Sequence, residues 1–179
     1  GTLIERADRA PRSNASLLVC AGKVSQVRDG HVDAAAFGEA GAGAVLVDLK
    51  GHTVLPGLID SHVHLVSDRA GVAAQLAAVT DEVPDMAYEA AWNARKTLRA
   101  GFTTVRNLGD GRGVTLALRD AIREGKAVGP RIFDAGQSIS VTSGHMDGRL
   151  GYASALHAAV SSGANLCDGA DECRKTVRR

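Results

Sequence analysis

The pattern of hydrophobic and polar positions divides the chain into two parts. Before residue 54, short apolar runs alternate with turn residues and show no helical spacing, which is typical of β-strands. The segments expected here are a hairpin, a Gly- and Ala-rich loop and a further strand: residues 16–20 and 23–27 around the turn Ala21-Gly22, residues 33–44, and residues 44–49. This first part is therefore expected to be rich in β-strands.

From residue 54 onward, strand-like segments alternate with segments of helical periodicity. The expected strands are residues 54–65, 102–107 and 130–135, and the expected helices are residues 86–100, 114–124 and a short segment after Asp168-Gly169. Asp85 is expected to cap the first of these helices after Pro84 has ended the preceding segment, and Gly101 is expected to stop it. Ala90 and Ala94 lie on its apolar stripe.

The composition is that of a globular protein and argues against two classes of partner. With 45% hydrophobic residues and a formal net charge of +1 over 179 residues, the chain lacks the concentrated basic face of a nucleic-acid-binding protein. Its basic cluster, Arg174-Lys175 and Arg178-Arg179, is expected to close a helix, where cations are favoured. No apolar run approaches membrane-spanning length, so neither nucleic acid nor a membrane is an expected partner.

The three cysteines, Cys20, Cys167 and Cys173, are odd in number and show no paired zinc spacing. We expect them to be small buried hydrophobic residues or free thiols in a reducing compartment. No signal-peptide pattern opens the chain, which favours a cytoplasmic location. The chain begins with Gly instead of Met, so its start is expected to be processed, trimmed or incomplete.

The strand expected over residues 54–65 carries the most informative chemistry. Successive side chains on a strand point to opposite faces, so Asp60, His62 and His64 are expected on one face. Two imidazoles and a carboxylate are costly to bury without partners, and a metal ion supplies one. Imidazole suits zinc and similar metals, which makes His62 and His64 candidate ligands, while Asp60 touches the same site or orients a ligand. The alternative, surface histidines on an edge strand, is disfavoured by the apolar opposite face and the Pro-Gly entry.

Several motifs make the chain resemble a known family. The stretch Pro56-Gly57-Leu58-Ile59-Asp60-x-His62-x-His64 resembles the first barrel strand of the metal-dependent amidohydrolase superfamily, in which the His-x-His pair binds the more buried metal. Similar motifs follow at residues 101–106, 129–132, 143–147 and 168–172. Together they are similar to the subgroup of Xaa-Pro dipeptidases, related carboxypeptidases and ochratoxin-type amidases, and they span nearly the whole chain.

This resemblance implies an α/β fold in two parts: strands of a small β-sandwich over residues 1–53, and the N-terminal part of a TIM-like (β/α) barrel over residues 54–179. A complete barrel takes about 250 residues, so the barrel is expected to be incomplete in this chain. The resemblance also implies one or two divalent metal ions, zinc first of all, held by His62 and His64. The family draws a carboxylated lysine, two further histidines and a catalytic aspartate from later strands, so the general base is expected outside this chain.

The function that the resemblance implies is hydrolysis of an amide or peptide bond in a small molecule, an N-acyl amino acid or a dipeptide, with this chain inactive alone. Two alternatives stay open. One is another reaction of the superfamily, such as deamination or cyclic-amide hydrolysis; the other is a non-catalytic half-barrel that serves as a complementing fragment or assembly partner. Half a barrel leaves an open sheet edge and uncovered faces, so an aggregate, a homo-oligomer or a complex with a complementing chain is expected.

Outside the metal strand, His145 is the strongest candidate for a substrate-binding residue. It lies in the polar loop of residues 136–151, which follows a strand at the end of the barrel where active sites are built. The alternative is a hydrogen bond that stabilises this loop. Arg106 and Asn107, at the end of another strand, either line the same end of the barrel or anchor the loop. No metal or substrate role is expected for the remaining histidines, His31, His52 and His157.

Overall fold

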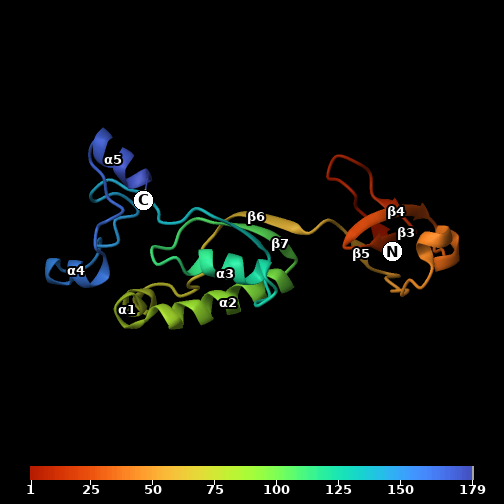
Figure 1. Cartoon of the computed structure of the whole chain (residues 1–179), viewed down its shortest axis with the longest axis horizontal. Coiled ribbons are helices and arrows are strands. Elements are labelled where there is room, and N and C mark those ends of the chain that lie inside the picture. The colour runs from red at the N-terminus through yellow and green to blue at the C-terminus, as the bar shows by residue number, and fades with distance from the viewer. Residues whose placement is uncertain (179) are drawn as a thin grey trace. The chain divides into compact units, whose positions relative to one another are not determined.

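The computed structural model describes residues 1–178, and the chain falls into two compact units, Gly1–Pro56 and Gly57–Arg179. Figure 1 traces the elements of each unit in chain order. Arg179, one member of the predicted basic cluster, lies outside the described residues. None of the helices among the described residues combines the length and the apolar character needed to cross a membrane.

The first unit contains two small β-sheets, which are sandwich-like, as predicted. Its strands are β1 (Thr2–Leu3), β2 (Arg12–Ser13), β3 (Ala15–Cys20), β4 (Lys23–Asp29) and β5 (Thr53–Val54). One sheet has the order β2-β1-β5 and the other is the antiparallel hairpin β3-β4. The predicted hairpin is confirmed: Ala21 and Gly22 both have positive φ angles (48° and 73°), which a tight two-residue turn requires.

Two predictions for this unit were wrong. Residues 44–49 form no strand: Val45 and Leu46 are 88% and 75% exposed, and no strand within residues 1–178 pairs with this segment. An apolar, β-branched run favours extended backbone but is not stable as a strand without a neighbour. Residues 33–44 are not a plain loop, because they contain the 3₁₀ helix η1 (Ala34–Gly41), whose start is capped where the Asp33 carboxylate accepts the N–H of Ala36 (3.2 Å).

The second unit is built on a parallel sheet of order β6-β7-β8 with helices packed against one face. Its first elements are β6 (Leu58–Val63), α1 (Val72–Thr80), α2 (Val83–Arg99), β7 (Phe102–Asn107), α3 (Val114–Arg123) and β8 (Arg131–Asp134). In Figure 1, α2 and α3 lie beside this sheet. This is the predicted α/β arrangement of strand–helix units, and the described residues form no closed barrel.

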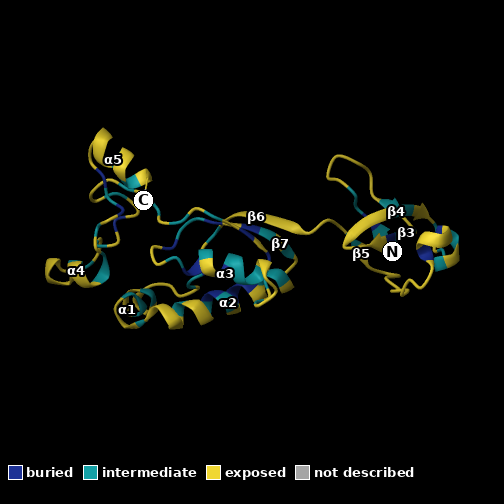
Figure 2. Ribbon diagram, in the orientation of Figure 1, coloured by how far each residue is buried: buried dark blue, intermediate teal, exposed yellow. Residues whose placement is uncertain are grey.

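The core lies between the sheet and the two long helices. It consists of the buried residues Leu65, Ala90, Ala94, Val105, Val114, Leu118 and Ile132. The predicted stripe of α2 is confirmed, because Ala90 and Ala94 are fully buried. The sheet also carries exposed apolar side chains: Ile59 is 72% exposed and Phe133 is 59% exposed, and β6 appears as an exposed segment in Figure 2. The strand expected to be buried is therefore open to solvent in the described chain.

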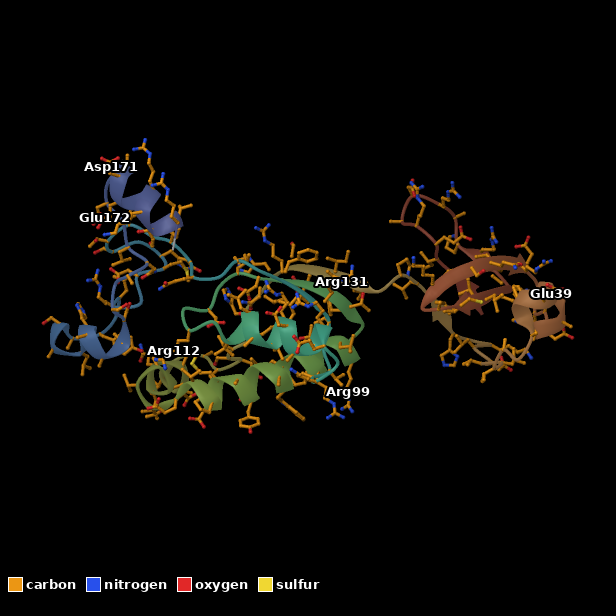
Figure 3. All side chains as sticks on the ribbon, in the orientation of Figure 1. Glu39, Arg99, Arg112, Arg131, Asp171 and Glu172 are labelled. Carbon is orange, nitrogen blue, oxygen red and sulfur yellow. A yellow bond between two sulfur atoms is a disulfide. The ribbon has the colours of Figure 1, made fainter. Side chains whose placement is uncertain are left out.

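The helix α2 starts earlier than predicted. Glu82, and not Asp85, is its N-cap, and Pro84 lies within its first turn, where the missing N–H costs nothing. The carboxylate of Asp85 instead accepts the N–H of Glu82 (3.0 Å) and completes a capping box. Gly101 follows the helix with φ of 96°, a value that favours glycine and explains the predicted stop. Ahead of α3, Arg112 reaches the carbonyl of Asp81 beyond the end of α1 (3.4 Å; Figure 3).

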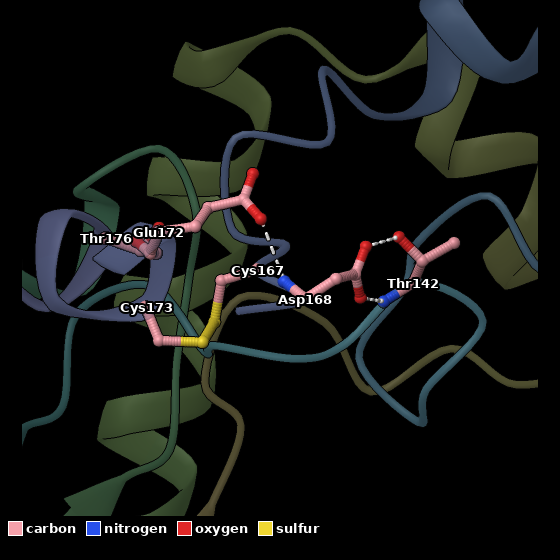
Figure 4. Close-up of a disulfide and its surroundings, with 6 residues drawn as sticks. All are labelled: Thr142, Cys167, Asp168, Glu172, Cys173 and Thr176. Carbon is pink, nitrogen blue, oxygen red and sulfur yellow. Dashed lines mark hydrogen bonds between the residues drawn. A yellow bond between two sulfur atoms is a disulfide. The ribbon is translucent and has the colours of Figure 1, made fainter. Parts of the chain in front are cut away.

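The last part of the unit is mainly loops with short helices, η2 (Ser154–Leu156), α4 (His157–Val160) and α5 (Ala170–Val177). The predicted helix α5 is confirmed, with acidic residues in its first turn and basic residues in its last. The prediction that the cysteines are buried hydrophobic residues or free thiols was wrong for Cys167 and Cys173, which form a disulfide (Figure 4). The turn into α5 brings their Cα atoms to 5.0 Å, a relation that the odd cysteine count concealed. Cys20 is a free, exposed thiol.

Candidate functional site

The two candidate metal ligands lie beside each other at the end of β6. The ring centroids of His62 and His64 are 5.4 Å apart, with an angle of 71° between the ring planes. Both residues are exposed, and neither ring forms a hydrogen bond within residues 1–178. Their nitrogen atoms are therefore available to a ligand, although the predicted burial of the strand does not hold in the described chain.

Asp60 contacts this pair through the backbone. Its carboxylate, which is half-buried, accepts the backbone N–H of His62 (3.0 Å). The pairing of β6 with β7 shifts register between Asp60 and Val63, so the alternation predicted for this strand is interrupted. From His62 onward the alternation is regular: the two histidines are exposed, Val63 is half-buried and Leu65 is buried.

The donor set fits part of a metal site. Zinc is commonly bound by imidazole nitrogen, and a catalytic zinc site uses three protein ligands and an open position. His62 and His64 supply two such donors in adjacent positions. No group of three or more His, Cys, Asp or Glu side chains that could hold a metal ion is present in the described part of the chain. The two histidines are thus suited to be two ligands of a centre that needs further residues.

Two buried amide side chains hold the residue that follows His64. The N–H of Leu65 donates to Oδ1 of Asn107 (3.0 Å), and Nδ2 of Asn93 donates to the carbonyl of Leu65 (3.0 Å). Asn107 is therefore an anchor, one of the two roles considered for it, whereas Arg106 is exposed. Sequence reasoning missed Asn93. Its position, three residues after Ala90 on the buried stripe of α2, was the available signal.

A polar network extends from Asn107 to the start of α3. Nδ2 of Asn107 donates to the hydroxyl of Thr115 and to the carboxylate of Asp134, both at 3.0 Å. Thr115 in turn donates its backbone N–H (2.6 Å) and its hydroxyl (2.7 Å) to Asp110. Burial opposes ionisation of Asp110, but hydrogen bonds from Thr115, Arg112 and Val114 together outweigh it and hold the pKa of Asp110 below its usual value. The network joins the ends of β7 and β8 to α3.

His145 lies in a loop that is held by charged groups. Asp147 is buried, and its carboxylate accepts the guanidinium of Arg149 through two bonds of 2.8 Å and the N–H of Ser143 (3.0 Å). The Arg149 side chain and the Ser143 amide lower the pKa of Asp147 strongly. His145 itself is exposed and has no hydrogen-bond partner within residues 1–178. The substrate-binding role of His145 stays a prediction.

The same loop is tied to the segment that precedes α5. Ser140 pairs with Leu166, and the N–H of Cys167 donates to the carbonyl of Ser140 (2.9 Å). Asp168 accepts the hydroxyl of Thr142 (2.6 Å) and its N–H (2.8 Å), as Figure 4 shows, and these bonds lower the pKa of Asp168. The disulfide joins this segment to α5. The loop that carries His145 is therefore held by ionised carboxylates and by backbone hydrogen bonds to a segment that a disulfide joins to α5.

The other three histidines form local contacts. His31 is exposed and 3.3 Å from Oδ1 of Asn14, and His52 is exposed and 3.1 Å from the carbonyl of Lys50. Their predicted surface position is confirmed. His157 is half-buried, with Nε2 3.2 Å from the carbonyl of Tyr152.

Comparison with known proteins places this geometry in a family. Residues 53–179 match the family model described as the amidohydrolase family. The chain belongs to the amidohydrolase family. The predicted resemblance is thereby confirmed, and His62 and His64 lie at the end of the first parallel strand of an amidohydrolase.

Individual relatives agree with this assignment. A solved Xaa-Pro dipeptidase with methionine bound in its active site is 34% identical with a TM-score of 0.82, and the match covers 99% of this chain and 42% of that chain. The structure of ochratoxinase from Aspergillus niger is 25% identical with a TM-score of 0.65 over the same shares. The curated A. niger ochratoxinase is 28% identical, over 70% of this amidohydrolase chain. The chain spans 28% of the length of that curated relative.

Proposed function

We propose that this amidohydrolase-family chain supplies His62 and His64 to a metal centre that hydrolyses an amide or peptide bond. The observation that carries the proposal is the placement of the two unpartnered imidazoles, 5.4 Å apart at the end of β6, in a chain of this family. Zinc is the proposed metal, with one or two ions in the complete centre, because the donors are nitrogen atoms of imidazole.

The residues of this chain have defined roles in the proposal. A bound metal would lower the pKa of its water ligand and polarise the scissile carbonyl. His62 and His64 hold the metal through ring nitrogens, and Asp60 orients His62 through the backbone bond of 3.0 Å. His145 donates to a substrate carboxylate or to the oxyanion that forms when water attacks the amide. We assign no general base within this chain and place it on later barrel strands.

The proposed substrates are N-acyl amino acids or dipeptides. This choice is supported by the similarity to a Xaa-Pro dipeptidase and to an ochratoxinase. A non-catalytic half-barrel is a second candidate function, and a specific observation favours it: the exposed apolar side chains of Ile59 and Phe133 leave a sheet surface that further strands or a partner chain would cover.

The test compares the 179-residue chain with the product of the whole reading frame that encodes it, both supplied with zinc. The substrates are Xaa-Pro dipeptides and N-acyl amino acids in one set, cyclic amides in a second, and amino-substituted heterocycles in a third. We expect turnover of the first set by the whole product and none by the chain alone. His62→Ala should lower that turnover by at least about a hundredfold, since it removes a metal ligand.

Each of the other outcomes would support a different function. Turnover confined to the second or third set would replace amide hydrolysis by another reaction of the family. Wild-type turnover in His62→Ala would contradict the metal role. A reading frame that ends at the same residue, together with an inactive product, would leave the non-catalytic half-barrel.

A cytoplasmic location is likewise a proposal, and the disulfide weighs against it, because disulfides are rare in reducing compartments. Thiol labelling of the protein in intact cells would test it. Three reactive cysteines would support the cytoplasm, and a single reactive Cys20 would support an oxidising compartment.

A further inference from the structure

We propose that Asn93 and Asn107 are positioning residues for the histidine pair: together they fix the backbone of Leu65 and thereby the direction of His64. This inference rests on the proposed metal role of His62 and His64. It concerns the residues around that role, which touch neither the metal nor a substrate.

His64 lies between two anchored neighbours. The N–H of Leu108 donates to the carbonyl of Val63 (3.0 Å), which is the last backbone bond that joins β6 to the end of β7. Beyond it, both polar backbone groups of Leu65 bond to side chains, the N–H to Asn107 and the carbonyl to Asn93. The backbone is thus fixed on both sides of His64, although its imidazole is exposed.

The site of Asn107 requires an amide. The side chain is fully buried, its oxygen accepts from Leu65, and its nitrogen donates to both Thr115 and Asp134. Only Asn or Gln offers one acceptor and two donors in one planar group. The Leu65 N–H can only donate, so the orientation of the amide is determined by its partners.

Asn93 is not explained by stability alone. It is 6% exposed, and its Oδ1 is buried without a hydrogen-bond partner among the described residues. A buried acceptor without a partner is unfavourable, and a leucine of similar shape would avoid it. What the amide does, apart from a longer bond of 3.4 Å to Glu89, is hold the carbonyl of Leu65. The unpaired oxygen is therefore the cost of holding the backbone beside His64.

The test uses the product of the whole reading frame that encodes this chain, and three variants of it. Asn93→Leu removes the bond to the Leu65 carbonyl, and Asn107→Leu removes the bond to its N–H. Leu118→Ala is the matched control, because it opens the same core and the apolar Leu118 side chain cannot form a hydrogen bond to either backbone group. Zinc affinity is measured at a temperature where every variant is folded, from the shifts of the His62 and His64 ring signals in NMR spectra. Mobility of the His64 ring is measured by relaxation without metal.

The expected results separate positioning from stability. Asn93→Leu should unfold at or above the wild-type temperature yet bind zinc about tenfold more weakly, the low end of the range for partners that orient a metal ligand. Asn107→Leu should lose affinity similarly and lose hydrogen-exchange protection at the Leu65 amide. Leu118→Ala should unfold earlier with wild-type zinc affinity. If Asn107→Leu does not fold, the zinc affinity of Asn93→Leu alone tests the positioning role.

Two results would overturn the inference: wild-type zinc affinity in Asn93→Leu, or an equal loss of affinity in Leu118→Ala. If the wild-type ring signals do not respond to zinc at all, the proposed function fails instead. The positioning role is then judged by the metal-free measurement. Greater mobility of the His64 ring in Asn93→Leu than in wild type supports it, and unchanged mobility overturns it.

Discussion

The second unit presents histidines in two different ways. His62 and His64 lie at the end of a strand, and buried amides from α2 and β7 hold the backbone next to them. His145 lies in a loop, and that loop is held by the Asp147–Arg149 ion pair, the bonds from Thr142 to Asp168, and a segment that ends in a disulfide. All three histidines are exposed, so they differ not in accessibility but in the groups that hold their backbone.

This difference has a physical consequence. Amides do not titrate or change with redox state, so the two amide bonds that hold the Leu65 backbone persist over a wide range of conditions, and carboxylates enter only at Asp60 and behind Asn107. The His145 loop is held by ionised carboxylates and by hydrogen bonds to a disulfide-linked segment, and both carboxylates and disulfides respond to solution conditions. The backbone beside His62 and His64 is therefore held by groups that are insensitive to redox state, whereas the loop of His145 is held by groups that respond to pH and redox state. Metal ligands need precise positions, which a strand provides, whereas a substrate-binding residue tolerates the less precise position of a loop.

The largest expected effect concerns His145. In the complete enzyme, His145→Ala should keep its metal but lose catalytic efficiency by about ten- to a thousandfold, the range for one positioned donor. Metal content by elemental analysis and kcat/KM together measure this. Wild-type kinetics would show that His145 has no role in substrate binding. Loss of metal would show that His145 is a metal ligand, like His62 and His64.

Reduction of the disulfide should increase backbone mobility only around the His145 loop and the segment that is bonded to it. A bridge that closes a loop this short contributes on the order of 2 kcal/mol, so hydrogen exchange in residues 138–168 should accelerate after treatment with a phosphine reductant. Amides of β6, β7 and β8 should exchange as before. Cys20→Ser is the control for the free thiol. Equal acceleration in the sheet would show that the two regions are not independent.

Acid should act on the same region. The pKa of Asp147 is lowered in the folded chain, so its ionised form stabilises the fold above the ordinary carboxyl pKa, and this stabilisation is lost as the pH falls toward the lowered value. We expect the thermal midpoint to fall between about pH 5 and about pH 3, and to fall less in Asp147→Asn. Asp171→Asn, which removes an exposed carboxylate of α5, is the comparison variant. Identical pH profiles in wild type and Asp147→Asn would contradict this prediction.

The smallest effect on stability is expected at the uncovered sheet. Ile59→Lys and Phe133→Lys replace exposed side chains, so each should change the free energy of unfolding by no more than about 0.5 kcal/mol. Both should nevertheless reduce the self-association predicted for a half-barrel, because they place charge on an apolar surface. Sedimentation at several concentrations measures this. A wild-type chain that is a monomer throughout would show that this surface needs no cover.

Sequence patterns could predict the strand–helix order of the second unit because each element carries its own local signal. The stripe through Ala90 and Ala94 and the stop at Gly101 are examples, and the turn Ala21-Gly22 is a similar local signal in the first unit. Residues 44–49 show where local signals fail, since an apolar run becomes a strand only beside a partner. The Cys167–Cys173 link was missed for a related reason: the separation of two cysteines does not reveal the turn between them.

The histidine pair was predictable, whereas its support was not. Alternation along a strand placed His62 and His64 together, and their rings are adjacent. Asn93 and Asn107 lie far from them in the sequence, and their bonds to Leu65 arise only when α2 and β7 pack together. A polar residue on an apolar stripe was the one available signal. Long-range hydrogen bonds of this kind have no periodicity to detect.

Zinc titration of the product of the whole reading frame, followed through the ring signals of the six histidines in residues 1–179, tests the proposed metal role most directly. We expect the signals of His62 and His64 to shift together and saturate, while those of His31, His52, His145 and His157 stay in place. His64→Ala should weaken the zinc response of His62 as well, because it removes one ligand of the shared metal. An unresponsive His62 and His64, or an equal response at His145, would contradict the claim.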